Sequence, residues 1–233
     1  MTETALVISG VTPFTTLDYP AHLSAVVWCQ GCPWRCRYCH NPELLCGKPE
    51  QQLDWQDIRA WLQERTGLLD AVVFSGGEAS LQPGLAQAMA EVKALGFKVG
   101  LHSAGVSPKH LEPLLKLVDW LGLDIKALPA DLDGIIGKPG QGDRHWQCLD
   151  LALQSGVDFE VRTTWHGELM PVAALKMLMK SLAARGVRHH ALQLVRPGQM
   201  LDPGLGRPNV SETTLAALTA LGLSLFPHFE LRR

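Results

Sequence analysis

The sequence lacks the features that would assign a protein to a membrane or to nucleic acid. No apolar stretch approaches the run of about 20 residues that spans a bilayer. The first residues carry neither the positive charge nor the apolar segment of a secretion signal. The formal net charge is −2, so there is no basic excess that would attract a polyanion. We therefore expect a cytoplasmic protein that binds neither membranes nor nucleic acid.

The composition is that of an ordinary globular domain. The chain has 233 residues, of which 46% are hydrophobic and 19% charged, and it contains no internal repeat or low-complexity tract. Six cysteines are present. In a reducing compartment, clustered cysteines are more often metal ligands than disulfides.

Three of the cysteines form the most informative motif. Cys32, Cys36 and Cys39 follow the spacing C-x3-C-x2-C within one short loop. A cubane iron–sulfur cluster has four irons, and each normally takes one protein thiolate. A loop that offers three thiolates leaves one iron open, and an open coordination position is where a metal site performs chemistry.

Two other metal-site interpretations stay open, and the first depends on Cys29. It precedes Cys32 by three residues, so Cys29, Cys32, Cys36 and Cys39 could form a four-thiolate zinc site. Only three residues separate the two pairs, whereas zinc ribbons usually separate theirs by ten or more. Cys29 also ends the apolar run 23–28 and is most simply a core thiol. An iron–sulfur protein that only transfers electrons is the second alternative.

Short apolar runs alternate with stretches of helical periodicity along most of the chain. We expect strands at residues 23–28, 71–75, 97–102, 120–126, 158–164 and 191–195, and helices at about 54–63, 85–95, from 107, 146–153, 172–182 and 211–221. Such alternation predicts a parallel sheet with helical crossovers, and six units are two short of a closed eight-fold barrel. We therefore predict an α/β fold: an open partial (β/α)6 barrel at residues 21–233, with a short N-terminal strand appendage at residues 1–20.

Polar residues gather where the predicted strands end. Gly76 and Gly77, in the stretch Ser75-Gly-Gly-Glu78, would let the backbone approach a ligand, and Glu78 adds an acceptor. Asp124 and Lys126 lie two residues apart, so their side chains share one face of a strand. Two Pro/Gly-rich stretches, 127–144 and 196–209, also follow strands. Sites of barrel-like folds lie at this edge.

Two further strand ends extend the same set of polar residues. His102 and Ser103 end the third predicted strand and could reach the same cavity. Arg162 and Thr164 lie in the fifth, where a charged group among apolar neighbours needs a partner, such as a ligand or Glu160. His189 and His190 precede a strand; we expect them to face solvent and assign them no role.

These motifs occur in an order that resembles a known enzyme superfamily. Cys39-His-Asn-Pro42, together with Ser75-Gly-Gly-Glu78, Leu123-Asp-Ile-Lys126 and Arg162-Thr-Thr164, resembles the radical S-adenosylmethionine (SAM) enzymes, and among them the glycyl-radical-enzyme activating proteins. The narrowest likeness is to the short activating protein of anaerobic ribonucleoside-triphosphate reductase. The resemblance covers about residues 14–196. The family more often continues Gly-Gly-Glu with proline and threonine, where this chain has alanine and serine.

The resemblance implies a cofactor set and a group of contacts. Cys32, Cys36 and Cys39 would hold one [4Fe-4S] cluster, and SAM would bind its fourth iron. The resemblance and the polar residues at the strand ends together give a set of expected SAM contacts. These are Tyr38, His40, Ser75, Gly76, Gly77, Glu78, His102, Ser103, Asp124, Lys126, Arg162 and Thr164.

The implied reaction is an oxidoreductase reaction on a partner protein. An external donor such as flavodoxin or ferredoxin would reduce the cluster, SAM would be cleaved to a 5′-deoxyadenosyl radical, and this radical would take a hydrogen from one glycine of the partner. The partner expected from the resemblance is anaerobic ribonucleoside-triphosphate reductase. A radical SAM enzyme acting on a small molecule, such as a deazapurine synthase, stays open as an alternative.

Overall fold

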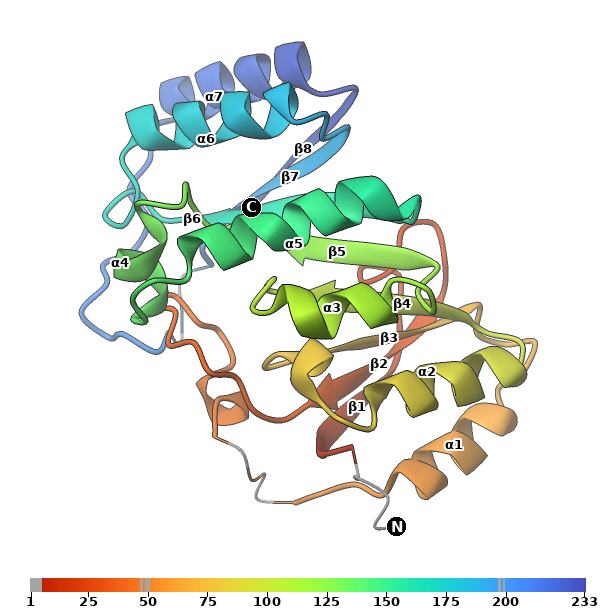
Figure 1. Ribbon diagram of the computed structural model, residues 1–233. Helices are drawn as coiled ribbons and strands as arrows, with labels where there is room; N and C mark the ends of the chain where they lie inside the picture. The colour runs from red at the N-terminus through yellow and green to blue at the C-terminus, as the bar shows by residue number, and fades with distance from the viewer. Residues whose placement is uncertain (1–5, 47, 49–50, 197, 199) are drawn as a thin grey trace.

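The computed structural model of the protein describes residues 6–46, 48, 51–196, 198 and 200–233. One eight-stranded sheet runs through it, with the strands side by side in chain order (Figure 1). The strands are β1 (Ile8–Thr15), β2 (Ser24–Cys29), β3 (Ala71–Gly76), β4 (Lys98–Ser103), β5 (Trp120–Asp124), β6 (Asp158–Trp165), β7 (His189–Leu194) and β8 (His228–Arg232). The helices are α1 (Trp55–Gln63), α2 (Leu85–Ala94), α3 (Pro108–Leu114), α4 (Leu132–Ile136), α5 (Gly142–Ser155), α6 (Val172–Ala184) and α7 (Glu212–Leu225), with short 3-10 turns at Pro42–Leu44 and Ala79–Leu81.

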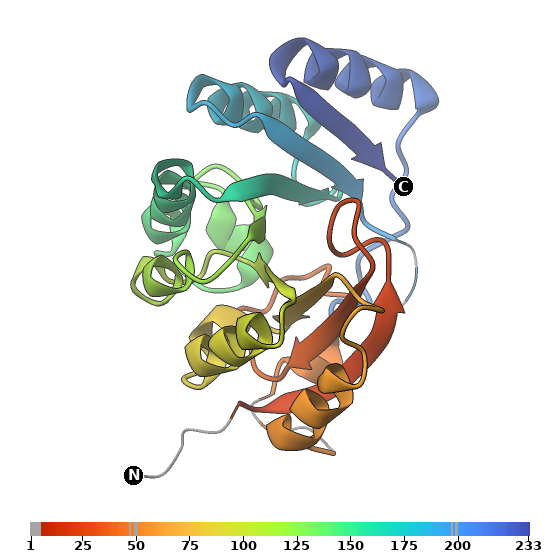
Figure 2. The same cartoon turned by 90° about the vertical axis from the view of Figure 1, so that its right-hand side faces the viewer.

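The sheet is curved but open. Strands β2 to β8 are all parallel, and only β1 runs antiparallel, against β2. In Figure 2 the helices cover the outer side of the curved sheet, and β1 and β8 form its two edges. Six strand–helix units lead from β2 to α7. The prediction of an open α/β barrel with six such units is therefore confirmed.

The N-terminal segment continues the same sheet. β1 pairs with β2 from Ile8 to Thr15, and Leu6 and Ile8 are buried in the main core. The expected boundary near residue 20 falls in the loop that joins these two strands, and residues 1–5 lie outside the described part of the chain. The division at residue 20 stays a prediction.

Two expectations from the sequence were wrong, both near β7. The seventh parallel strand, β8, was not expected, because its sequence His-Phe-Glu-Leu-Arg has no long apolar run. His190 was expected in solvent but is buried, with its ring 4.7 Å from that of Phe226. Successive residues of a strand point to opposite faces. His190 therefore lies under the outer layer, whereas its neighbour His189 is exposed.

The concave side of the sheet is partly filled from the β1–β2 loop. Tyr19 packs there with Val26, Val73 and Trp120 in a small apolar cluster apart from the main core. Gly100 makes room for it, since a Cβ at this position would lie 3.1 Å from the Tyr19 ring. The loop thus fills the concave side near the middle of β4, and the strand ends beyond it stay accessible. Among the described residues, no helix is long and apolar enough to cross a membrane.

Candidate active site

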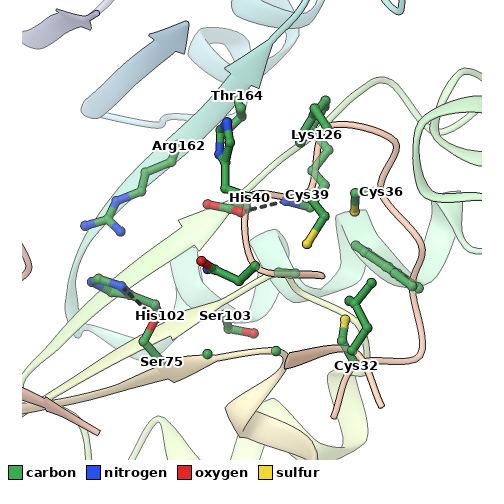
Figure 3. A pocket seen from close by; sticks show the side chains of 18 of the residues that line it. Cys32, Cys36, Cys39, His40, Ser75, His102, Ser103, Lys126, Arg162 and Thr164 are labelled. Atoms are coloured by element: carbon green, nitrogen blue, oxygen red, sulfur yellow. Dashed lines mark hydrogen bonds and ion pairs between the residues drawn. The ribbon is translucent and has the colours of Figure 1, made fainter. Parts of the chain in front are cut away.

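A cavity of about 290 Å³ lies at the carboxyl ends of the strands. It receives side chains from the cysteine loop and from β3 to β7, and all the predicted site residues except Glu78 line it. Figure 3 shows the three cysteines at one end of the group and Arg162 with His102 at the other. The prediction that polar residues at the strand ends share one cavity therefore grouped residues that are more than 100 positions apart in the sequence.

Sequence reasoning missed part of the lining. Trp28, Trp34, Asn41, Leu45, Ala104, Gln193 and Arg196 also face the cavity. Gln193 and Arg196 could have been predicted in the same way as the other strand-end residues, because they lie at or just beyond the end of β7. Trp34 and Asn41 belong to the cysteine loop, where the sequence had singled out only the three cysteines, Tyr38 and His40.

The cysteine loop is fixed by backbone hydrogen bonds to three other segments. The N–H of Gly31 donates to Leu44 O at 2.8 Å, and the N–H of Arg35 donates to Ile136 O at 2.8 Å. The N–H of Glu78 in turn donates to Gly31 O at 2.9 Å. These contacts hold the loop between the 3-10 turn that follows it, the end of α4 and the Gly-Gly turn.

Burial disfavours the thiolate form of the three loop cysteines. Burial, with a contribution from Glu78, raises the pKa of Cys32 to about 12. Burial also raises the pKa of Cys36 and Cys39, although the N–H of Asn41 donates to Cys39 and opposes the shift. Metal ligation requires thiolates, so a metal group that binds here displaces these protons.

The donor set fits an iron–sulfur cluster better than a zinc ion. Within the described residues, no three His, Cys, Asp or Glu side chains gather tightly enough to hold one metal ion. Zinc requires four ligands around a single ion, whereas each cysteine of a cubane binds a different iron. Trp34 Nε1 and Tyr38 Oη, on the same loop, are buried without a hydrogen-bond partner in the described structure. Both are donors, and a cluster with its sulfurs would offer acceptors.

The Gly-Gly turn allows β3 and the cysteine loop to touch. Gly76 has φ 120°, and a Cβ on it would overlap the backbone oxygen of Cys29. A Cβ on Gly77 would overlap the backbone oxygen of Gly31. Only glycine fits at these two positions, because the backbone of the cysteine loop lies against them. The approach to a ligand that we expected from the sequence stays a prediction.

Glu78 lies behind the cavity wall. Its carboxylate is 1% exposed and accepts hydrogen bonds from Ser80 N (3.2 Å), Ser80 Oγ (2.6 Å), Ser103 Oγ (2.9 Å) and Ala104 N (2.7 Å). Burial raises the pKa of Glu78, and these four donors oppose the shift. In this structure Glu78 therefore holds the β4 end in place against the Gly-Gly turn, and its carboxylate does not reach the cavity.

Asp124 and Lys126 form an ion pair beside the cysteines. Lys126 Nζ lies 2.7 Å from Asp124 Oδ2, and the lysine is buried. Burial alone would lower the pKa of Lys126, but the Asp124 carboxylate beside it raises that pKa well above its ordinary value. The predicted shared face is confirmed, and the lysine stays a cation at the cavity wall.

His102 is a neutral side chain with a defined tautomer. Its Nε2 lies 2.9 Å from Asp18 O, which can only accept, so Nε2 carries the proton. Its Nδ1 then accepts from Ser75 Oγ at 3.2 Å. Burial and the nearby Arg162 hold the pKa of His102 well below its ordinary value. His40, in the cysteine loop, lies with Nε2 3.3 Å from Arg196 O.

Arg162 reaches the cavity from β6. Its Nε donates to Glu160 Oε1 at 3.0 Å, and its guanidinium carbon lies 5.1 Å from the centre of the Trp120 ring. The internal carboxylate partner expected for this arginine is therefore Glu160. Thr164, two residues further along β6, also lines the cavity.

Comparison with known proteins identifies the family of the chain. The model of the radical SAM superfamily matches residues 26–170, more than half of the chain. A protein of Methanocaldococcus jannaschii, named as a candidate glycyl-radical enzyme activating enzyme, is 27% identical over 206 residues, covering 84% of this chain and 82% of its own. The pyruvate formate-lyase-activating enzyme of Clostridium pasteurianum is 34% identical over 161 residues, and the match spans 66% of each chain.

Solved structures share the fold. The structure of QueE from Escherichia coli matches 98% of this chain and 94% of its own with a TM-score of 0.60, at 14% sequence identity. The TM-score shows a common architecture, and a sequence identity this low says nothing about the substrate. The family match covers the cysteine loop and the strand ends that line the cavity from β2 to β6. On this evidence the chain is an enzyme that belongs to the radical SAM superfamily.

Proposed function

We propose that the protein generates a glycyl radical on a partner enzyme, using SAM and one [4Fe-4S] cluster. The observation that carries the proposal is that three free thiols and polar side chains from β3 to β6 line the same cavity. The name of the Methanocaldococcus relative refers to activation of a glycyl-radical enzyme, and the name of the Clostridium relative refers to activation of pyruvate formate-lyase.

The residues divide the task between the two ends of the cavity. Cys32, Cys36 and Cys39 would hold the cluster, and the Asp124–Lys126 pair, with Tyr38 and His40, would bind SAM beside it. When bound, the cluster and SAM supply reductive carbon–sulfur bond cleavage and hydrogen abstraction from an unreactive carbon. The protein contributes orientation and exclusion of water.

The other end of the cavity would bind the remainder of SAM. Ser75, the Gly76–Gly77 backbone, His102, Ser103, Arg162 and Thr164 would donate to or pack against it. Burial and the nearby Arg162 favour the neutral form of His102, so its ring would pack against a ligand without adding charge. Glu78 would act through Ser103 and Ala104, which it holds in place.

Anaerobic ribonucleoside-triphosphate reductase is the proposed partner. The support is the Cys39-His-Asn-Pro42 sequence with the three strand-end motifs. We further propose a flavodoxin or ferredoxin as electron donor and a cytoplasmic location, without a membrane or nucleic-acid partner. Pyruvate formate-lyase is the second candidate acceptor, because the Clostridium relative is named for it.

The test uses electron paramagnetic resonance under anaerobic conditions. The cluster-loaded protein, SAM and a reductant are mixed with either of the two acceptor enzymes, and the amount of glycyl radical per acceptor chain is quantified from the signal intensity. We expect a signal with the ribonucleotide reductase and none when its acceptor glycine is replaced by alanine. A signal with pyruvate formate-lyase alone would reassign the partner. Formation of 5′-deoxyadenosine without a protein radical on either enzyme would favour a small-molecule substrate.

A further inference from the structure

Arg162 carries hydrogen-bond donors that no described residue accepts. Its guanidinium group has five N–H donors. One, on Nε, is used by Glu160, and no described residue accepts from the four N–H groups on the two Nη atoms. The side chain is 11% exposed. Neither Nη atom is among the buried polar atoms that lack a partner in the described structure, so these donors open into the cavity that Arg162 lines, where a bound ligand can accept from them.

The position of this guanidinium is fixed from three sides. Gly122 on β5 leaves the space it occupies, since a Cβ there would lie 2.8 Å from Arg162 Cζ. The Trp120 ring lies against the group. Glu160, two residues earlier on β6 and therefore on the same face of the strand, accepts from Nε.

Glu160 is in turn held by an arginine from the far edge of the sheet. Arg232 on β8 donates from Nη1 to Glu160 Oε1 and from Nη2 to Glu160 Oε2, both at 2.8 Å. This two-point geometry is the strong form of an arginine–carboxylate pair. Arg232 reaches over β7, where the register places Ala191 between Arg162 and Glu230. The short side chain of Ala191 leaves that route open.

The charges of this group favour an electron-rich ligand. Arg232 is shared between Glu160 and the exposed Glu230, whereas Arg162 has Glu160 as its only ion-pair partner among the described residues. Burial alone would raise the pKa of Glu160, but the hydrogen bonds and charges of the two arginines lower it. The carboxylate therefore stays ionised and keeps its hold on both arginines.

We propose that Arg232 and Glu160 are positioning residues that aim the free edge of Arg162 at acceptor atoms of SAM. β8 thereby contributes to the site although it lies two strands away from β6. The proposal rests on the assignment of the cavity to SAM, and not on the identity of the partner enzyme.

The test measures SAM affinity rather than turnover. Binding of labelled SAM to the cluster-loaded protein is measured by equilibrium dialysis, anaerobically and without reductant, so that SAM is not consumed. We expect Arg232→Met to raise the SAM dissociation constant about tenfold, and Arg162→Met to raise it at least as much. Arg232→Lys, which keeps one donor to Glu160, should restore most of the affinity.

A double-variant cycle separates positioning from a general loss of stability. If Arg232 acts through Arg162, then Arg232→Met should cost no further affinity in the Arg162→Met background. Arg233→Met is the matched control, because Arg233 pairs with the exposed Glu212 and has no contact with the cavity. It should bind SAM as the unchanged protein does.

Several results would overturn the proposal while leaving the proposed function standing. These are unchanged affinity in Arg232→Met, equal losses in both backgrounds, or an equal loss in Arg233→Met. If Arg232→Met folds poorly, Glu160→Gln breaks the same link with a side chain of the same shape and should show the same tenfold loss. Failure of the proposed function is a separate result, namely SAM binding without a glycyl radical on either acceptor enzyme.

Discussion

At the scale of single residues, burial separates Cys29 from the cysteines of the loop. Cys29 is fully buried at the end of β2, and burial raises the pKa of its thiol to about 12. It is absent from the cavity lining, whereas Cys32, Cys36 and Cys39 all face the cavity. The structure thus supports three ligands and one core thiol.

This division predicts opposite effects of two alanine substitutions. Cys36→Ala should abolish cluster assembly, because it removes a ligand, whereas Cys29→Ala should leave it intact and cost only a small core cavity. Iron and sulfide per chain after anaerobic reconstitution measure the difference. Equal iron loss in the two variants would contradict the three-ligand assignment.

Lys126 gives a second prediction at this scale. Lys126→Ala removes a buried cation that faces the cavity and pairs with Asp124 at 2.7 Å. We expect SAM affinity to fall by about tenfold or more, with iron content unchanged, since the lysine is not a ligand. Dialysis with labelled SAM and an iron assay on the same samples check both parts. Unaltered SAM affinity would remove Lys126 from the site.

His190 predicts how stability depends on pH. Its Nε2 donates to Thr163 Oγ1 at 3.1 Å, because that hydroxyl donates its own proton to Ile125 O. Its Nδ1 is buried and has no partner in the described structure, so a second proton would have no acceptor. Burial accordingly lowers the pKa of His190 from 6.5 to about 4. The unfolded chain therefore binds this proton more tightly than the folded chain does.

The sign follows from linkage between protonation and folding. Between pH 6.5 and about 4 the unfolded state holds more protons, so the free energy of unfolding falls as the pH falls. One such group contributes up to about 3 kcal/mol over this window. In His190→Phe we expect a shallower fall, measured by urea denaturation at several pH values. The same slope in both proteins would show that His190 does not carry this dependence.

The sequence correctly predicted which residues face the cavity where the residue type and its position at a strand end or in the cysteine motif both indicate a site. The three cysteines, Lys126 and Arg162 all face the cavity, because a strand end or a fixed ligand spacing determines their direction. Glu78 was expected in the cavity, but the structure turns its carboxylate toward Ser80, Ser103 and Ala104. Ser103 and Ala104 lie at the end of the neighbouring strand β4, and no local pattern in the sequence reveals their contact with Glu78.

At the scale of elements, the end of β3 and the cysteine loop form one unit. The N–H of Gly77 donates to Cys29 O and the N–H of Glu78 donates to Gly31 O, both at 2.9 Å. Leu44, from the 3-10 turn, also packs against this turn, because its backbone oxygen lies 2.9 Å from the position that a Cβ on Gly77 would take. The loop that presents the thiols is therefore held by the turn that opens the cavity.

This packing predicts that one methyl group disrupts the cluster site. Gly77→Ala should lower both iron content and stability, the latter by about 3 kcal/mol or more, because the new Cβ overlaps the Gly31 backbone. Gly134→Ala in α4 is the matched control, since nothing lies within 4 Å of its Cβ position. It should assemble a full cluster and be slightly more stable. Equal behaviour of the two variants in an iron assay and in urea would contradict the packing argument.

The sequence predicted the elements that carry strong periodicity and missed the ones that depend on tertiary contacts. Alternating apolar strands and helices gave β2 to β7 and six of the helices. Strand β8 is held by pairing with β7 and by packing of Phe229 near Phe226, and α4 lies in a Pro/Gly-rich stretch that read as a loop. Part of the second such stretch, at residues 197 and 199, lies outside the described chain.

At the scale of the whole molecule, the open sheet explains how one site could serve a protein substrate. The strand order places β1 and β8 at opposite edges, and among the described residues no strand pairing joins these two edges. The cavity lies at the carboxyl ends of the strands of this curved sheet. A segment of another protein could therefore approach the concave side, which a closed eight-stranded barrel filled with side chains would not permit.

Reductive cleavage of SAM by this protein should depend on the three loop cysteines. The most direct measurement reconstitutes the protein anaerobically with iron and sulfide, adds SAM and a strong reductant, and quantifies 5′-deoxyadenosine in parallel with the Cys36→Ala variant. We predict product from the unchanged protein and none from the variant. Absence of product from both, with zinc rather than iron retained through purification, would contradict the account and favour a structural zinc site.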